Sequence, residues 1–342
     1  MRTRDYSLNR AILAALEERR GYVSGEDLSG RFGLSRAAIW KHIQALRDDG
    51  YEIKAKPHQG YVLVERPDRL SSHEIRRNLR TAGLIGDICT FEEVTSTNDK
   101  AYEMALHGAQ EGVVVIAESQ TQGRGRLNRA WFSPHGKNLY LSVILRPLIP
   151  PRLVPVLTYL GAISTAEVLS DTFSLDVELK WPNDVLRRGK KIAGLLNEVK
   201  AETDRVDFVV LGFGVNLNLD TETLPREIHE KATSVMVELG HTVSRVEFTR
   251  RLLESIETWY NAFLLQGAIP VVQKWESLAR IRGAFLEVKS FDDVYQGVVE
   301  GLDHDGTLLL RKSSGERMRV IAGDVTKASV QPPGMGEKRS DD

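Results

Sequence analysis

The first fifty residues contain three short stretches in which apolar residues recur at helical spacing. The stretches are residues 7–19, 24–32 and 36–48. Apolar positions three or four residues apart share one face of a helix. Ser24 with Asp27 fits a capping box, Ser35 precedes the third stretch as an N-cap, and Gly33 predicts a tight turn before it. The apolar positions of the first and third predicted helices are Leu8, Ile12, Leu13, Leu16, Ile39, Ile43 and Leu46.

Two helices joined by a glycine turn and followed by a two-stranded hairpin at residues 51–64 are typical of a winged helix-turn-helix. In a major groove Arg36 and Gln44 can read base edges, and Lys41 can hold a phosphate. Trp40 fits either the core or a contact with the sugar-phosphate backbone. The residues expected to contact DNA are Ser35, Arg36, Ala37, Lys41, Gln44, Lys54 and Lys56. The alternative is a three-helix protein-interaction module that binds no DNA.

The middle of the chain, residues 67–282, mixes strand and helix patterns and predicts an α+β domain. Pro67 marks its start, and Ser71 with Glu74 fits the capping box of a linker helix running to about Arg80. The expected strands are 88–94, 113–117, 139–145, 192–200 and 206–213, with one more from 177 into a proline turn. The expected helices begin after 98 and cover 153–173, 246–265 and 270–280.

From residue 283 the pattern changes to short strands separated by turns. The expected strands are 285–290, 294–302, 307–311, 318–322 and 325–329. Five short strands in so little sequence predict a small β-barrel over residues 283–330. The polar, Pro- and Gly-containing segment 331–342 has the composition of a disordered tail.

Composition narrows the class of protein. The 342 residues carry 46 Lys+Arg against 47 Asp+Glu, a net charge of −1, so DNA binding requires a local basic surface. The single cysteine, Cys89, cannot form an internal disulfide and fits a reducing compartment. The sequence shows no signal-peptide core and no 18-residue apolar run, which predicts a cytoplasmic protein without a membrane span.

One loop stands out chemically, between the strands expected at 113–117 and 139–145. In it Gly123 and Gly125 alternate with arginines, and an aromatic residue, Trp131, follows. Glycine lets a backbone approach a ligand closely, and clustered arginines bind anions, phosphates above all. The arginines are Arg124, Arg126 and Arg129. Taken alone, the same pattern also fits a mobile basic loop or an arginine-rich contact with nucleic acid.

Four motifs in this order resemble the signatures of biotin–protein ligases. They are Gly123–Arg126 with Arg129–Pro134, Lys180–Asp184, Lys191–Gly194 and Gly212–Asn216. With the preceding helix-turn-helix, the chain is similar to the bifunctional type, a ligase that is also a biotin-sensing transcriptional repressor. The resemblance implies a class II synthetase-like mixed-sheet domain and an SH3-like C-terminal barrel. Asn128 stands where the family often has glycine, and asparagine tolerates the left-handed backbone that such a turn needs.

The resemblance also implies a reaction, in which biotin and ATP give biotinyl-5′-adenylate and an acceptor lysine then takes the biotinyl group. Lys180, Lys191 and Arg124 would be catalytic, with Mg²⁺ held through the ATP phosphates. Biotin would contact Ser96, Thr97, Asn98, Gln120, Arg124, Gly125, Arg126, Lys191, Gly194, Gly212 and Gly214. Adenylate or ATP would contact Arg126, Arg129, Trp131, Asn183 and Asn216. The implied partners are biotin carboxyl carrier protein, operator DNA and a second copy of the chain.

Individual features fit plainer interpretations as well. Ser96 and its neighbours before a helix fit an N-cap, and Asn183 with Asp184 fits ordinary turn chemistry. Three glycines on adjacent strands, Gly194, Gly212 and Gly214, suggest a floor for a flat ligand. Two other functions stay open at this point: a lipoate-type acyl ligase of the same architecture, and a repressor whose large domain only senses a ligand.

Overall fold

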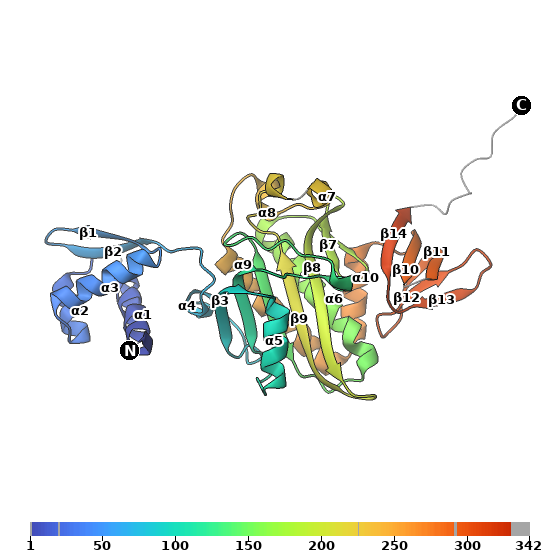
Figure 1. Cartoon of the computed structure of the whole chain (residues 1–342), viewed down its shortest axis with the longest axis horizontal. Coiled ribbons are helices and arrows are strands. Elements are labelled where there is room, and N and C mark those ends of the chain that lie inside the picture. The colour runs from blue at the N-terminus through green and yellow to red at the C-terminus, as the bar shows by residue number, and fades with distance from the viewer. Residues whose placement is uncertain (1, 20, 225, 291–292, 330–342) are drawn as a thin grey trace, which may run out of the picture. The chain divides into compact units, whose positions relative to one another are not determined.

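The computed structural model describes residues 2–19, 21–224, 226–290 and 293–329 (Figure 1). The prediction made for residues 331–342 lies outside the described residues. The chain divides into two compact units, Met1–Arg69 and Leu70–Asp342.

The first unit is a three-helix module with a β-hairpin. Its elements are α1 (Arg2–Glu18), α2 (Gly25–Phe32), α3 (Arg36–Asp48), β1 (Glu52–Lys56) and β2 (Gly60–Glu65). The Ser24 and Ser35 hydroxyls cap α2 and α3, and Gly33 ends α2 with a left-handed φ of 64°. Strands β1 and β2 pair antiparallel. Ile12, Leu13, Leu16, Ile39, Ile43 and Leu46 are buried in one hydrophobic core, with Leu8 packed against it.

The second unit is built on a seven-stranded sheet with the order β3-β4-β5-β9-β8-β7-β6. Strands β3 and β4 are parallel, whereas every other neighbouring pair is antiparallel, so the sheet is mixed as predicted. The strands are β3 (Ile88–Val94), β4 (Val114–Gln120), β5 (Leu139–Leu145), β6 (Glu178–Lys180), β7 (Asp184–Arg187), β8 (Lys190–Ala201) and β9 (Val206–Val215).

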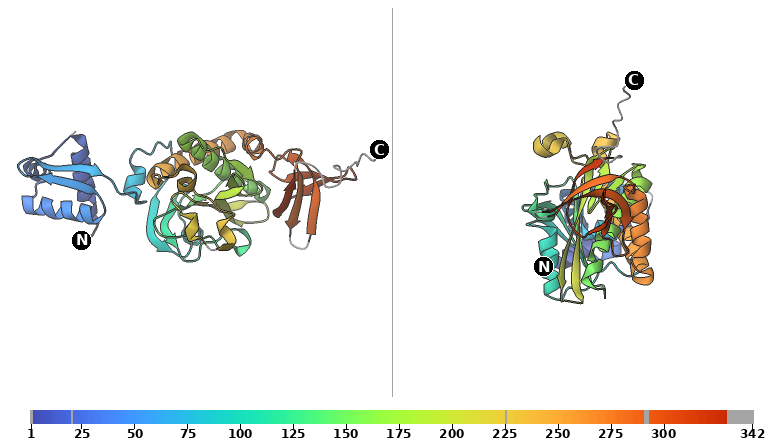
Figure 2. Two further views of the ribbon diagram at one scale, coloured as in Figure 1. Left: turned by 90° about the horizontal axis from the view of Figure 1, so that it is seen from above. Right: turned by 90° about the vertical axis from the view of Figure 1, so that its right-hand side faces the viewer.

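Helices cover both faces of this sheet (Figures 1 and 2). Helix α5 (Thr97–Leu106) packs Ala101 and Ala105 against one face, whereas α6 (Val154–Phe173), α9 (Arg245–Gln266) and α10 (Ile269–Ala279) share the large core on the other. Helix α4 (Ser72–Arg76) is shorter than the helix expected to run to about Arg80, because the chain turns extended at Arg77 and left-handed at Asn78. The short helices α7 (Arg226–His229) and α8 (Val235–Leu239) were not predicted.

The helix expected at 153–173 is present as α6 and is unusually apolar. The helical segment Pro151–Phe173, which includes α6, is long and apolar enough to cross a membrane by length and composition. Within this helix, 72% of the most apolar 18-residue stretch is buried inside the protein. Leu157, Leu160 and Ile163 belong to the main core. A core helix enclosed by a sheet and by other helices is apolar all round for that reason.

Five antiparallel strands form the C-terminal part, in the order β13-β12-β11-β10-β14. They are β10 (Phe285–Ser290), β11 (Asp293–Leu302), β12 (Leu308–Arg311), β13 (Arg317–Val320) and β14 (Asp324–Ser329). Tyr159 on α6 donates a hydrogen bond to the Gly306 carbonyl (2.6 Å) in the β11–β12 loop, and its oxygen accepts one from Trp181 Nε1 (2.9 Å). These bonds join the five-stranded part to the turn after β6.

Candidate active site and nucleic-acid interface

A cavity of about 470 Å³ opens in the second unit beside the arginine loop. Its lining comes from the start of α5, the loop between β4 and β5, the β6–β7 turn, β8, β9 and the start of β14. The cavity brings together every residue that the sequence assigned to biotin, ATP or catalysis. These residues are Ser96, Thr97, Asn98, Gln120, Arg124, Gly125, Arg126, Arg129, Trp131, Lys180, Asn183, Lys191, Gly194, Gly212, Gly214 and Asn216.

The start of α5 is tied to the sheet by side-chain hydrogen bonds. Ser96 caps the helix, and Gln120 Oε1 accepts the backbone N–H of Thr97 (2.8 Å). The Thr97 hydroxyl lies 2.9 Å from the hydroxyl of Ser142, a buried residue on β5. Ser142 was missed by sequence reasoning, because a serine in a buried strand carries no local signal of its partner. The plainer N-cap interpretation of Ser96 therefore holds, and the same segment also lines the cavity.

The arginine loop folds into a tight turn with two left-handed residues, Leu127 (φ 55°) and Asn128 (φ 56°). Asparagine thus adopts the backbone expected of it. Gly125 N–H donates to the Arg129 carbonyl (2.8 Å), and Trp131 N–H donates to the Gly123 carbonyl (2.8 Å). These bonds return the chain toward β5 and direct the arginine side chains to both sides of the cavity.

Most of the cavity's cations are paired with carboxylates. Arg124 Nη2 lies 2.5 Å from Asp99 and 2.7 Å from Glu198, and hydrogen bonding to Asp99 is the main cause of its raised pKa. Lys191 Nζ lies 2.6 Å from Asp184. Lys180 has no ion-pair partner among the residues that the structure describes. The charges of Arg124 and Lys191 are thus held in place, and Lys191 can exchange its one carboxylate for an incoming anion.

Residues 323–325 of the C-terminal part complete one wall. Asp324 forms ion pairs with Arg126 (3.5 Å) and Arg129, and the Gly323 carbonyl accepts from Arg126 Nη1 (3.1 Å). Asp324 and Val325 both line the cavity. Sequence reasoning missed this contribution, because a contact across almost 200 residues leaves no local pattern.

Trp131 lies over the glycine floor. A Cβ on Gly214 would come within 2.5 Å of the Trp131 ring and one on Gly194 within 3.1 Å, whereas one on Gly212 would collide with the Asn98 amide. Lys191 Nζ lies 5.2 Å from the centroid of the Trp131 ring, within cation–π range. In the predicted glycine floor, Gly194 and Gly214 therefore lie against the Trp131 ring, and Gly212 lies against the Asn98 side chain.

The two asparagines assigned to the nucleotide end hold neighbouring backbone. Asn183 Nδ2 donates to the Leu195 carbonyl (2.6 Å) in the turn after the cis Trp181–Pro182 peptide. Asn216 Nδ2 donates to the Thr233 carbonyl (3.0 Å), and its Oδ1 accepts from Asn138 (3.5 Å). Both side chains fix the cavity edge as well as lining it.

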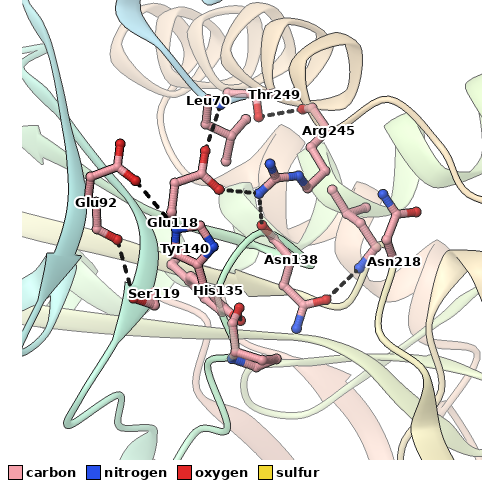
Figure 3. Close-up of polar contacts among 12 residues, drawn as sticks. Leu70, Glu92, Glu118, Ser119, His135, Asn138, Tyr140, Asn218, Arg245 and Thr249 are labelled. Atoms are coloured by element: carbon pink, nitrogen blue, oxygen red, sulfur yellow. Dashed lines mark hydrogen bonds and ion pairs between the residues drawn. The ribbon is translucent and has the colours of Figure 1, made fainter. Parts of the chain in front are cut away.

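Both ends of the arginine loop are anchored to α9 (Figure 3). Arg245 Nη1 donates to Glu118 on β4 (2.7 Å) and to the Asn138 carbonyl at the start of β5 (3.4 Å). The other Glu118 oxygen accepts the backbone N–H of Leu70 (2.9 Å). Glu118 and Asn138 bracket the loop in sequence, so this buried network sets where the loop leaves and rejoins the sheet.

In the first unit, α3 presents a continuous outer stripe. Arg36, Ala37, Trp40 and Lys41 are exposed and Gln44 is partly exposed, at helical spacing. Trp40 is 53% exposed, which excludes a core position. The Ser35 hydroxyl oxygen accepts a hydrogen bond from the Ala38 N–H. Arg36 forms an exposed ion pair with Glu26 (3.2 Å). The wing residues Lys54 and Lys56 are also exposed.

Three segments match known protein families. Residues 90–216 match the biotin/lipoate A/B protein ligase family, residues 9–62 a helix-turn-helix domain, and residues 287–327 the biotin protein ligase C-terminal domain. The chain is 36% identical over 304 residues to the bifunctional ligase/repressor BirA of Bacillus subtilis (strain 168), covering 89% of this chain and 93% of that protein.

Two further likenesses each cover about two thirds of the chain or more. The chain is 31% identical over 235 residues to the biotin–[acetyl-CoA-carboxylase] ligase of Paracoccus denitrificans, covering 67% of this chain and 96% of that protein. The solved biotin protein ligase of Aquifex aeolicus in complex with biotin and ATP superposes with a TM-score of 0.61 at 26% identity, covering 71% of this chain and 98% of that one.

Proposed function

Because the chain belongs to the family of bifunctional biotin ligase/repressors, we propose that its cavity joins biotin and ATP into biotinyl-5′-adenylate and passes the biotinyl group to an acceptor lysine. The observation that carries this proposal is the convergence of all four motifs on one cavity. Its volume lies within the range of small-molecule sites, and apolar walls there carry a few convergent polar groups.

In the first step the biotin carboxylate attacks the α-phosphorus of ATP, a phosphoanhydride bond breaks, and pyrophosphate leaves. A carboxylate and a polyphosphate repel each other, so cations must offset their charge as the new bond forms. Lys191, Lys180 and Arg126 line the cavity and supply that charge. Lys191 would leave Asp184 to contact the reacting oxygens.

In the second step the acceptor lysine amine attacks the acyl carbon and AMP leaves with the electron pair of the broken bond. We assign the biotin ring to the α5 side, where Thr97 and Gln120 present polar atoms. We assign the nucleotide to the end lined by Asn183 and Asn216, with contacts to Arg129 and Trp131. Acceleration then rests on positioning and on charge, with no covalent enzyme intermediate.

Mg²⁺ would enter with the ATP phosphates. The acidic residues that line the cavity in the described chain are Asp184 and Asp324, and each is paired with a cation. This donor set suits a magnesium ion held through phosphate oxygens and water better than one held in a protein cage. The ion would supply charge neutralisation on the polyphosphate.

The ligase proposal is tested by biotin-dependent exchange of radiolabelled pyrophosphate into ATP, with lipoate as the competing acid. Exchange with biotin well above exchange with lipoate supports it. Equal exchange would favour the related acyl ligase. Binding of biotin with no exchange would leave a ligand-sensing repressor. Transfer is then followed by mass spectrometry of an isolated biotin carboxyl carrier domain, which gains the mass of one biotinyl group.

We also propose that the first unit binds operator DNA as half of a homodimer in the cytoplasm. The exposed stripe on α3 and the wing lysines support this role, because a helix with such an exposed face fits into the major groove of DNA. The test is a mobility-shift assay at fixed salt on the promoter region of the biotin genes. No shift at any protein concentration would favour a protein-interaction module.

A further inference from the structure

Glu198 on β8 joins two segments of the cavity wall through one carboxylate. Its Oε1 accepts from Arg124 Nη2 (2.7 Å), and its Oε2 accepts from Asn98 Nδ2 (2.8 Å). Asn98 belongs to the first turn of α5, whereas Arg124 belongs to the arginine loop. No other carboxylate in the described chain holds both residues, since Asp99 reaches only Arg124.

The Asn98 amide is fully committed. It is 4% exposed, its nitrogen donates to the Leu196 carbonyl (3.2 Å) and to Glu198, and its oxygen lies 2.6 Å from the Ser142 hydroxyl. Carbonyl and carboxylate oxygens only accept, so the Asn98 nitrogen must face them and its oxygen must face Ser142. Glu198, at the shorter distance, and the Leu196 carbonyl together set which way round the amide lies.

That orientation propagates to Thr97. A hydroxyl carries one hydrogen, and the Ser142 hydrogen is directed to the Asn98 oxygen at the shorter distance. The Thr97 hydrogen is then directed either to Gln120 Oε1 (3.2 Å) or to the Ser142 oxygen (2.9 Å), both of which can accept it. Thr97 is left with a lone pair as the polar feature it offers to the cavity, which suits an N–H donor such as that of a ureido ring.

Arg124 is held by charge on two sides. Its Nη2 contacts both Asp99 and Glu198, and these carboxylates raise its pKa, Asp99 contributing most. The side chains of Arg124 and Glu198 are 26% and 27% exposed, so solvent screens this pair only in part. Compensated in this way, Arg124 fastens the loop to α5 and β8 and has little net charge left for a phosphate.

We propose that Glu198 is a positioning residue for biotin recognition: it orients the Asn98–Ser142–Thr97 chain and fastens Arg124 of the loop over it. The proposal rests on the ligase function proposed above. It assigns Glu198 to the acid substrate and not to ATP, because neither Asn183 nor Asn216 contacts it in the described chain.

Glu198→Gln tests the proposal with almost no change in volume. A glutamine has one acceptor oxygen and one donor nitrogen, so it cannot accept from Asn98 and Arg124 through separate oxygens. We expect the KM for biotin in pyrophosphate exchange to rise about tenfold or more, the effect of losing one charge-assisted hydrogen bond. The KM for ATP and the kcat at saturating biotin stay within about twofold to threefold, a small change by the same arithmetic.

Two variants complete the design. Glu103→Gln removes a carboxylate on the outer face of α5, where it pairs with Lys100, and should leave both KM values unchanged. Ser142→Ala interrupts the same chain at its middle and should raise the KM for biotin selectively. If Glu198→Gln proves unstable, Ser142→Ala alone decides, and an unchanged biotin KM in it would overturn the proposal.

The outcomes separate this proposal from the ligase function. A wild-type chain with no biotin-dependent exchange would remove both. A fully active wild type beside a Glu198→Gln variant with an unchanged biotin KM removes only the role of Glu198. A variant whose KM values for biotin and ATP rise together would show general damage to the cavity and would also overturn the selective role.

Discussion

Glu118 and Arg245 form an ion pair at 2.7 Å in which both side chains are almost completely buried, at 5% and 4% exposed (Figure 3). Glu118 also accepts the Leu70 N–H, and Arg245 also donates to the Asn138 carbonyl. The pair therefore joins the first residue of the second unit to both ends of the arginine loop. The pair serves mainly to position these segments, because the desolvation penalty of burying two charges offsets much of their Coulombic attraction.

Removing one member of this pair should be strongly destabilising. Arg245→Ala leaves the Glu118 carboxylate buried without its counter-ion, a loss of about 3–5 kcal/mol in the free energy of unfolding. Urea denaturation of the second unit measures it, with Arg251→Ala on the exposed face of α9 as the control. The double variant Glu118→Leu with Arg245→Met should recover much of the loss. A single variant as stable as the wild type would show that water reaches the site.

Adenylation should depend on the two lysines of the cavity. Lys191→Ala or Lys180→Ala removes one aligned charge from the reacting oxygens, which corresponds to roughly 2.7–4 kcal/mol of barrier, or about 10²–10³ in rate. Neither change should unfold the protein, because both side chains are partly solvated. Lys190→Ala, the exposed neighbour on β8, is the matched control. A normal single-turnover rate of pyrophosphate release in either variant would exclude that lysine from the reacting centre.

The loop should retain the adenylate through Arg126. This residue reaches the Gly323 carbonyl and Asp324, so it joins the loop to the C-terminal wall of the cavity. Arg126→Gly should let free biotinyl-adenylate escape, and Asp324→Asn should do so to a smaller extent. Escape is measured as biotin transferred to lysines of an unrelated protein, with Arg205→Gly in the β8–β9 turn as the control. If the Arg126→Gly variant retains biotinyl-adenylate as well as the wild type does, other residues must hold the adenylate in the cavity.

The sequence could predict what depends on local chemistry. Ser24 and Ser35 cap their helices, and the motif residues reach one cavity because each motif lies in a loop or near one end of a strand. The acidic partners Glu198, Asp184 and Asp324 could not be assigned to their cations, because pairing across tens or hundreds of residues is a tertiary property. Helix α6 was predicted from its apolar run, but the elements that enclose that run are also a tertiary property.

DNA recognition should be separable from ligation. Arg36 is exposed at the start of α3, and its ion-pair partner Glu26 is also exposed, so the pair yields readily to a base edge. Arg36→Ala should weaken operator binding by about 1–3 kcal/mol if the contact is bidentate, with ligation unchanged. Lys41→Ala should weaken operator and random DNA alike, since a phosphate contact carries no sequence information. The measurement is a mobility shift at fixed salt with both DNAs.

Formation of the adenylate should strengthen self-association and operator binding together. A single winged helix-turn-helix contacts only a few base pairs, and a net charge of −1 gives little bulk attraction to DNA, so useful affinity calls for two copies on a paired site. The arginine loop must rearrange around the adenylate, because Arg126, Arg129 and Lys191 now hold carboxylates that phosphate would displace. A ligand that changes this loop can stabilise one surface over another, and any gain in dimerisation appears equally as a gain in adenylate affinity. Sedimentation velocity and operator shifts, with and without biotin and ATP, should therefore change in parallel. If neither changes, the chain is a ligase whose DNA-binding unit does not respond to biotin.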